Sequence, residues 1–202
     1  MTFKKILLAA VAVAFVSTAF AAKPKVKRVD SDKVIDLDGY WNDTDIRLVC
    51  ETLVNDCVSS PRVAKFEKTK GRAPYVIVGK IKNDSSERID TSIVAKRMQT
   101  AIINNGALEF VASKDERDEM REEKADQAEH AEYGTAKEID AEKAADYIMT
   151  GSVKTQVESA GKYTVRSYFV YVTLTDIESN KIIWQGENSD IKKYIKNQKV
   201  KL

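Results

Sequence analysis

The chain has 202 residues, of which 33 are basic and 31 are acidic, so its net charge is only +2. This balance gives no overall attraction to nucleic acid or to an acidic membrane. One histidine and two cysteines are too few for zinc patterns such as H-E-x-x-H, and the eight glycines form no phosphate-binding loop, so no cofactor is predicted.

Residues 1–21 have the pattern of an export signal. Lys4 and Lys5 precede an apolar run over residues 6–16, and Ala19-Phe20-Ala21 is an A-x-A cleavage site. We expect cleavage after Ala21 and a periplasmic location for the remaining chain. A retained membrane anchor is the alternative, although the run is short for a bilayer. No cysteine follows the run, so no lipid anchor is predicted.

Cleavage would remove two lysines and leave a neutral chain that is long enough for one domain with a substantial core. Residues 22–39 show no helical period and are expected to form an extended leader. Residues 40–191 are expected to form the globular domain. Residues 192–202 hold five lysines and no acid, and this basic tail is expected to be a frayed terminus rather than a binding site.

The first predicted helix carries both cysteines. Its apolar residues recur at helical spacing: Ile46, Val49, Cys50, Leu53, Val54 and Cys57. Seven helical residues span about 10 Å along the axis, whereas a disulfide needs Cα atoms within roughly 7 Å. We therefore expect two buried, unpaired thiols; a helix that ends before Cys57 and an intermolecular bridge are the alternatives. Asn42 or Asp43 is expected to cap this helix, and Ser59-Ser60-Pro61 to end it.

Strands and helices alternate in the middle of the chain. Residues 75–81 form an apolar, β-branched run and predict a buried strand. Asp90 is expected to cap a helix that ends at Gly106, with Ile89 and Val94 placed for a hydrophobic staple. A short strand is expected over residues 108–112.

A highly charged segment comes next. Ser113 and Glu116 form a capping box for a helix in which residues 114–132 hold nine acids and four bases. Such a charge run is typical of a solvated helix face. A shorter helix is expected over residues 135–145, before a third strand at residues 147–153.

The C-terminal part predicts a β-meander. Residues 163–174 are rich in aromatic and β-branched residues in both registers, which predicts a long strand covered on much of both faces. After a turn at residues 178–180, residues 182–186 return as its partner, and Trp184 is expected in the core. The predicted fold class is therefore α/β (α+β), a single domain with a mixed, mostly antiparallel sheet of about five strands and about four packed helices.

Little in the sequence points to catalysis. His130 lies in the charged helix and is expected to be exposed, and no Gly-x-Ser-x-Gly motif occurs. Glycosidase chemistry needs only two carboxylates and is not excluded by composition, but such pairs are expected by chance among 31 acids. The absence of a sharp catalytic motif favours a binding or interaction protein, so the chain is predicted not to be an enzyme. Tyr40 and Trp41, followed by Asn42 and Asp43, are the candidate partner-binding residues, because Trp and Tyr dominate interface hot spots. The alternative for Tyr40 and Trp41 is a hydrophobic plug beneath the domain.

Five segments carry a family resemblance that extends over residues 40–187. They are Trp41-Asn42, residues 78–83, residues 103–106 leading into 110–113, residues 145–148 with Gly151-Ser152, and the hairpin at residues 175–186. In this order and spacing they resemble the LpoB-type activators of bifunctional penicillin-binding proteins.

The resemblance implies a non-enzymatic envelope protein that stimulates peptidoglycan synthesis by docking on a class A penicillin-binding protein. It implies no cofactor and no catalytic residue. Family members are outer-membrane lipoproteins with a long stalk, whereas this chain lacks the lipid-bearing cysteine and has a short leader. The alternative function is that of a soluble envelope domain of the same fold, similar to curli-secretion or Tol-associated domains, in secretion or envelope assembly.

Overall fold

The computed structural model describes residues 27–30, 33–138 and 142–197. The expected signal peptide and its cleavage site lie outside the described residues, and they stay predictions. The chain divides into a unit that ends at Lys33 and a unit from Val34 onward. The described part of the first unit contains neither helix nor strand. Every helix and strand of the described residues belongs to the second unit.

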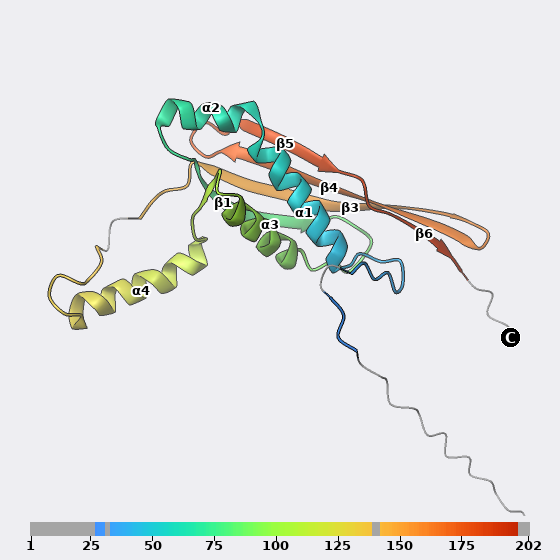
Figure 1. Ribbon diagram of the computed structural model, residues 1–202, viewed down its shortest axis with the longest axis horizontal. Coiled ribbons are helices and arrows are strands. Elements are labelled where there is room, and N and C mark those ends of the chain that lie inside the picture. The colour runs from blue at the N-terminus through green and yellow to red at the C-terminus, as the bar shows by residue number, and fades with distance from the viewer. Residues whose placement is uncertain (1–26, 31–32, 139–141, 198–202) are drawn as a thin grey trace, which may run out of the picture. The chain divides into compact units, whose positions relative to one another are not determined.

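A mixed sheet forms the centre of the second unit (Figure 1). Its strands run in the order β2-β1-β3-β4-β5, and β6 pairs with the first part of β4. β1 lies parallel to β2 and β3, while the β3–β4, β4–β5 and β4–β6 pairs are antiparallel. The bounds of the strands are β1 Tyr75–Asn83, β2 Glu109–Phe110, β3 Tyr147–Ala160, β4 Tyr163–Asp176, β5 Ile182–Asn188 and β6 Lys192–Lys196.

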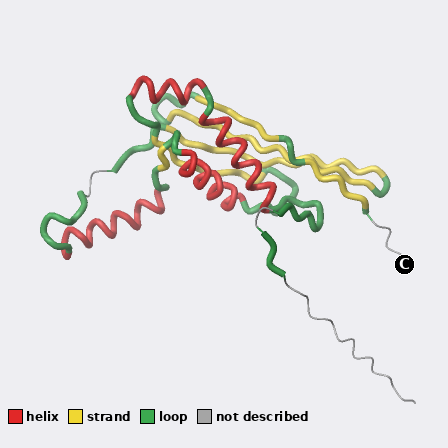
Figure 2. Tube along the Cα trace, in the orientation of Figure 1, coloured by secondary structure: helices red, strands yellow, loops and turns green. Residues whose placement is uncertain are grey.

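Four helices occur in the described residues: α1 Asp43–Val58, α2 Pro61–Lys70, α3 Thr91–Asn105 and α4 Lys114–His130. α1 and α3 pack against each other on one face of the sheet, where α3 contacts β1 and α1 contacts β5 (Figure 2). α4 buries none of its side chains, as its charge predicts. The predicted fold class, a single α+β domain with a mixed, mostly antiparallel sheet, is confirmed.

The core lies between α1, α3 and the sheet. It includes Val49, Leu53, Val54, Val94, Met98, Ile102, Val76, Met149, Val170, Val172 and Leu174. Cys50 and Cys57 are buried and free, so the prediction of unpaired thiols is confirmed. Trp184 is in the core as predicted, and its indole N–H donates to Asp56 Oδ2 at 3.0 Å.

The predicted helix caps are confirmed. Asn42 caps α1, Asp90 caps α3, and Gly106 ends α3 with a φ of 78° in the left-handed region. The capping box of Ser113 and Glu116 opens α4. These local signals therefore set the helix bounds before any tertiary contact is considered.

The structure adds one helix to the prediction and removes another. Ser59-Ser60-Pro61 ends α1, but Ser60 also caps α2 and Pro61 is its first residue, a position that suits proline. The expected helix at residues 135–145 is wrong: its described residues, 135–138 and 142–145, are not helical. The sequence of this segment has Ile139 as its one large apolar residue, and short helices depend on apolar packing for their stability.

Two further expectations need correction, and one is confirmed. β3 extends to Ala160 because it pairs with β4 along its whole length. Residues 192–196 are not frayed but form β6 on the edge of β4. The prediction that the strand at residues 163–174 is covered on much of both faces is confirmed, because one face of β4 is buried from Tyr168 to Leu174 and the other, with Phe169 and Tyr171, is half-buried. Cross-strand neighbours supply the partial burial on that face.

Candidate functional site

The segment from Tyr40 to Asp43 leads directly into α1 and is held in place by a capping box. The Asp45 N–H donates to Asn42 Oδ1 at 3.1 Å, and the Asn42 N–H donates to Asp45 Oδ2 at 3.1 Å. The Asn42 side chain also donates to Asp36 Oδ1 at 2.6 Å. Asn42 therefore fixes both the start of the helix and the chain that precedes it.

β6 holds this segment from the other side. The Lys193 ammonium bonds the Asp45 carboxylate at 2.9 Å and also pairs with Asp36. Gly39 has a φ of 73°, and a Cβ placed there would lie 2.6 Å from Ile195, so glycine is required by both conformation and space. The basic tail is therefore ordered here, and it positions the candidate residues.

A groove of about 480 Å³ lies between the start of α1 and the loop that enters α3. Its apolar surface and its polar rim come from both segments. The lining residues are Tyr40, Trp41, Asn42, Asp43, Ile46, Glu87, Arg88, Ile89, Asp90 and Ile93. A lining that mixes aromatic and aliphatic side chains with charged and polar ones is common in protein–protein interfaces.

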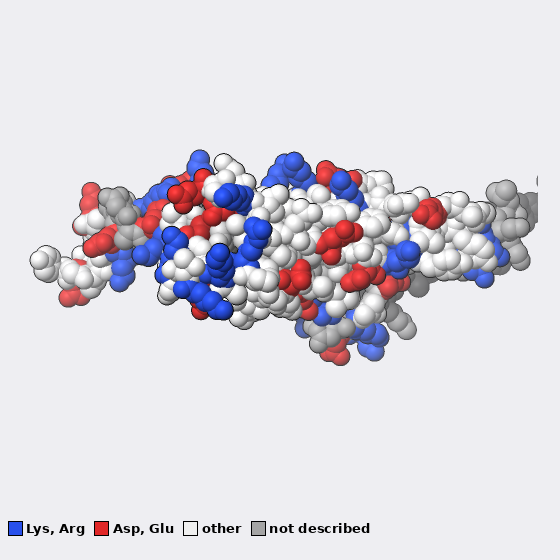
Figure 3. Space-filling model, turned by 90° about the horizontal axis from the view of Figure 1, so that it is seen from above, with Lys and Arg blue, Asp and Glu red and all other residues white. Residues whose placement is uncertain are grey.

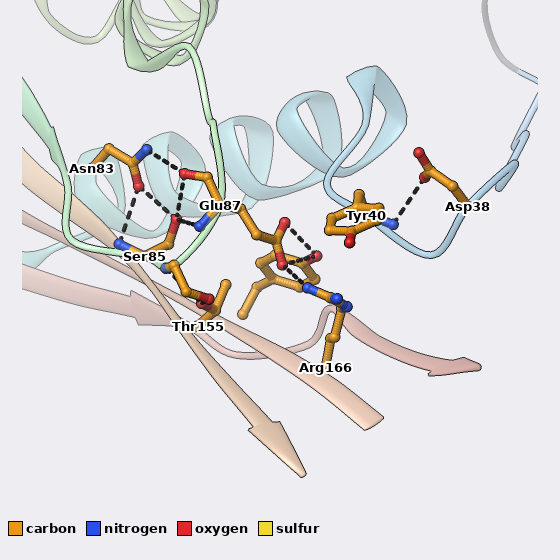
Figure 4. A network of polar contacts seen from close by, with 9 residues as sticks. Asp38, Tyr40, Asn83, Ser85, Glu87, Thr155 and Arg166 are labelled. Carbon is orange, nitrogen blue, oxygen red and sulfur yellow. Dashed lines mark hydrogen bonds and ion pairs between the residues drawn. The ribbon is translucent and has the colours of Figure 1, made fainter. Parts of the chain in front are cut away.

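At the groove, a largely buried ion pair between Glu87 and Arg166 joins the loop to the sheet (Figure 4). Arg166 Nη1 donates to Glu87 Oε1 at 2.7 Å, and the Tyr168 hydroxyl lies 2.9 Å from each oxygen of the same carboxylate. Burial, together with the bond to Glu87, raises the pKa of Tyr168, so the phenol stays protonated and can donate. The Arg166 guanidinium lies over the Tyr40 ring, 4.1 Å from its centroid.

The loop itself is cross-linked by short-range hydrogen bonds. Asn83 Nδ2 donates to the Glu87 carbonyl at 2.8 Å, and Ser85 Oγ donates to Asn83 Oδ1 at 2.6 Å. The Ser86 N–H donates to Thr155 Oγ1 of β3 at 3.2 Å (Figure 4). These bonds give the loop one defined conformation, which lowers the ordering cost of binding a partner.

The four sequence-predicted residues all line the groove, but they have different surroundings. Trp41 is half-buried, with its ring 5.2 Å from that of Tyr168, which agrees with the plug alternative. Tyr40 is 45% exposed, which leaves it available to a partner. Asn42 acts as the helix cap, and Asp43 is exposed beside it.

Sequence reasoning missed the other side of the groove. That side is formed by Glu87, Arg88 and Ile93, which come more than forty residues after Trp41. No motif or spacing in the sequence connects these residues to the segment from Tyr40 to Asp43. The polar run Ser85-Ser86-Glu87-Arg88 between a strand and a helix marks a loop, and it contains no signal for what the loop contacts.

The remaining chemistry of the described chain is sparse. His130 is exposed on α4, as predicted, where it contacts Asp126. Among the residues that the structure describes, no group of three or more His, Cys, Asp or Glu side chains could hold a metal ion. No helix in the described ranges combines the length and the apolar character needed to cross a bilayer.

One family model matches most of the chain. This family model, described as the peptidoglycan-synthase activator LpoB, matches residues 45–189. The LpoB C-terminal domain from Escherichia coli is similar in structure, with 14% identity, a TM-score of 0.46, and coverage of 71% of this chain and 96% of that chain. The NMR structure of E. coli LpoB has 12% identity and a TM-score of 0.43, over 90% of this chain and 87% of that chain.

A third structure extends the set. Lipoprotein GNA1162 from Neisseria meningitidis has 14% identity and a TM-score of 0.38, over 60% of this chain and 83% of that chain. No curated protein sequence matches the chain.

Proposed function

The chain belongs to the family of the peptidoglycan-synthase activator LpoB, and from this premise we propose that it is a non-enzymatic regulator that docks on a class A penicillin-binding protein in the periplasm. The observation that carries the proposal is the family match, which spans residues 45–189 and so includes every helix and β1 to β5, apart from the first two residues of α1. The export signal predicted at residues 1–21 supports the periplasmic location.

We propose the groove between the start of α1 and the β1–α3 loop as the docking surface. Tyr40 and Ile93 are 45% and 49% exposed, and both line it beside charged groups of the rim. Tyr, Trp and Arg are the residue types most enriched in binding hot spots, and this groove holds all three. Its hydrogen-bonded loop supplies a surface that needs little rearrangement on binding.

The proposal is tested with the purified chain beginning at Ala22 and the purified class A synthases of the same organism. Direct binding, together with faster polymerisation of glycan chains in the presence of the chain, is expected. An absence of binding to each of these synthases, with an unchanged polymerisation rate, would overturn the proposal. If the tagged chain captured secretion components from solubilised envelope, and no synthase, the alternative envelope role would be favoured.

A further inference from the structure

α2 concentrates positive charge at one end of the second unit. Among its ten residues it has four bases and one acid, and Figure 3 shows basic side chains gathered at this end of the molecule. The bases are Arg62, Lys65, Lys68 and Lys70, and all four are exposed. This local concentration contrasts with the near-neutral chain as a whole.

A hollow of about 460 Å³ lies beside α2, and its lining combines apolar and basic side chains. Phe66, Tyr147 and Ile183 contribute the apolar side chains. The other lining residues are Arg62, Lys65, Thr69 and Lys70, and none of the described residues that line the hollow is acidic. The hollow can therefore accept a ligand that has an anionic group next to an apolar one.

The helix geometry separates the acid of α2 from the hollow. Successive helical residues are rotated by roughly 100°, so Arg62, Lys65, Phe66, Thr69 and Lys70 share one face. Glu67 falls outside this face, and it is absent from the lining of the hollow. The charge presented by the hollow is therefore entirely positive.

The hollow is built on packed elements. Val63 is buried beneath α2, and the Phe66 ring meets the Tyr147 ring of β3 edge-on at 5.4 Å. Arg72 packs over the Phe66 ring at 5.2 Å, while its guanidinium bonds Asp146 at 2.8 Å and 3.0 Å. Arg72 is paired with Asp146, whereas no ion pair among the described residues involves Arg62, Lys65 or Lys70.

We propose that this hollow binds the surface of a bilayer that contains anionic phospholipid. The headgroup phosphate lies among Arg62, Lys65 and Lys70, and the first acyl carbons contact Phe66 and Ile183. Long basic side chains around an apolar patch suit the membrane interface, because their stems contact apolar groups while their charges reach the phosphates. Lys68, like Glu67, falls outside the face of α2 that borders the hollow and is absent from its lining. The inference is independent of the proposed synthase partner.

The test measures co-sedimentation of the chain beginning at Ala22 with vesicles, so that the apolar run at residues 6–16 does not contribute. Vesicles of phosphatidylcholine alone are compared with vesicles that also contain phosphatidylglycerol. The test variant is R62Q/K65Q/K70Q. The matched control K80Q/K82Q/K154Q loses the same charge from exposed lysines of β1 and β3. Thermal unfolding of each variant shows that it is folded.

We expect binding only to the phosphatidylglycerol vesicles, and weaker binding at high salt. Each basic residue at an anionic surface contributes about fivefold to the partition coefficient, so the test variant, which loses three, should bind roughly a hundredfold more weakly, and the control should lose much less. Three results would overturn the inference: no binding by the unmodified chain, equal losses in both variants, or displacement of the chain from vesicles by inorganic phosphate at unchanged salt. Displacement by inorganic phosphate would show that the hollow binds a free anion and not a bilayer surface. If an acidic protein bound at Arg62, Lys65 and Lys70 while vesicles did not bind, the partner would be a protein and the bilayer assignment would be wrong.

Discussion

The Tyr168 hydroxyl, in the middle of β4, lies 2.9 Å from each oxygen of the Glu87 carboxylate in the loop between β1 and α3. Arg166 completes the cluster from the same strand, and its guanidinium also supports the Tyr40 ring. One carboxylate thus connects the β1–α3 loop, the sheet and the segment that precedes α1. Glu87 therefore links the two sides of the proposed docking groove, because it lies in the loop on one side and pairs with Arg166, which contacts Tyr40 on the other.

The first prediction concerns this cluster. Glu87→Ala should lower the free energy of unfolding by about 3 kcal/mol, because it leaves the largely buried Arg166 charge without its partner. Tyr168→Phe removes only a hydroxyl and should cost about 1–2 kcal/mol. Urea unfolding measures both. Glu129→Ala, on the exposed face of α4, is the control and should change the free energy of unfolding by less than about 0.5 kcal/mol. A loss in this control as large as that of Glu87→Ala would contradict the prediction.

The second prediction contrasts two neighbouring lysines of β6. Lys193 is 10% exposed and pairs with Asp45, which is itself buried at the start of α1. Lys193→Ala should lower the free energy of unfolding by about 3 kcal/mol, because the Asp45 charge loses its partner. Lys192→Ala removes an exposed lysine from the opposite face of the strand and should have little effect. Hydrogen exchange should also show faster opening of β6 in the Lys193 variant alone.

Much of the fold could be predicted because its signals are local. Asn42, Asp90 and Gly106 mark helix ends through their own side chains or backbone conformation. The two β-branched and aromatic runs of the meander are adjacent in sequence, so their pairing follows from a short turn. These features do not depend on distant residues.

The sequence is less informative where a signal has two meanings or where distant contacts decide the structure. Pro61 indicates the end of one helix, but proline at the first position of a helix equally marks the start of the next. Lys193 belongs to a segment whose composition is typical of a frayed terminus, and its order depends on Asp45 and on β4. The groove likewise joins Tyr40 to Glu87 through Arg166, and no local pattern encodes that connection.

The third prediction concerns the reactivity of the cysteines. Burial raises the pKa of both Cys50 and Cys57 from 9.0 to about 12. Because the thiolate is the reactive form, neither cysteine should react with a thiol reagent in the folded chain at pH 8. Both should react fully in denaturant, and the labelling rate at intermediate denaturant should follow global unfolding. Rapid labelling of one cysteine under native conditions would contradict their shared burial.

The fourth prediction is a pH dependence that Asp146 produces. Burial raises the pKa of Asp146, but hydrogen bonds from Arg72 and from the Tyr75 N–H outweigh it and hold the pKa below the ordinary 3.8. A carboxyl whose pKa is lower in the folded state adds stability above its unfolded pKa, and this stability is lost as the pH falls through the folded value. The stability difference between the unmodified chain and Asp146→Asn should therefore be full near neutral pH and shrink below about pH 3.8. Urea unfolding across this range measures it.

The fifth prediction separates binding from packing in the proposed docking groove. Tyr40→Ala and Ile93→Ala remove exposed side chains, so each should weaken binding to the class A synthase by roughly tenfold or more, the loss expected of a hot-spot residue. Trp41→Ala should instead lower the melting temperature, because the indole packs on Tyr168.

Ile103→Ala provides the matched control for this prediction. Ile103 is an isoleucine of α3 like Ile93, it is 58% exposed, and it does not line the groove. Binding by this variant should match that of the unmodified chain, since the same side chain is removed from outside the proposed contact surface. If Ile103→Ala weakened binding while Tyr40→Ala and Ile93→Ala did not, the docking surface would lie at the opposite end of α3, and the groove would serve only to hold α1 on the sheet.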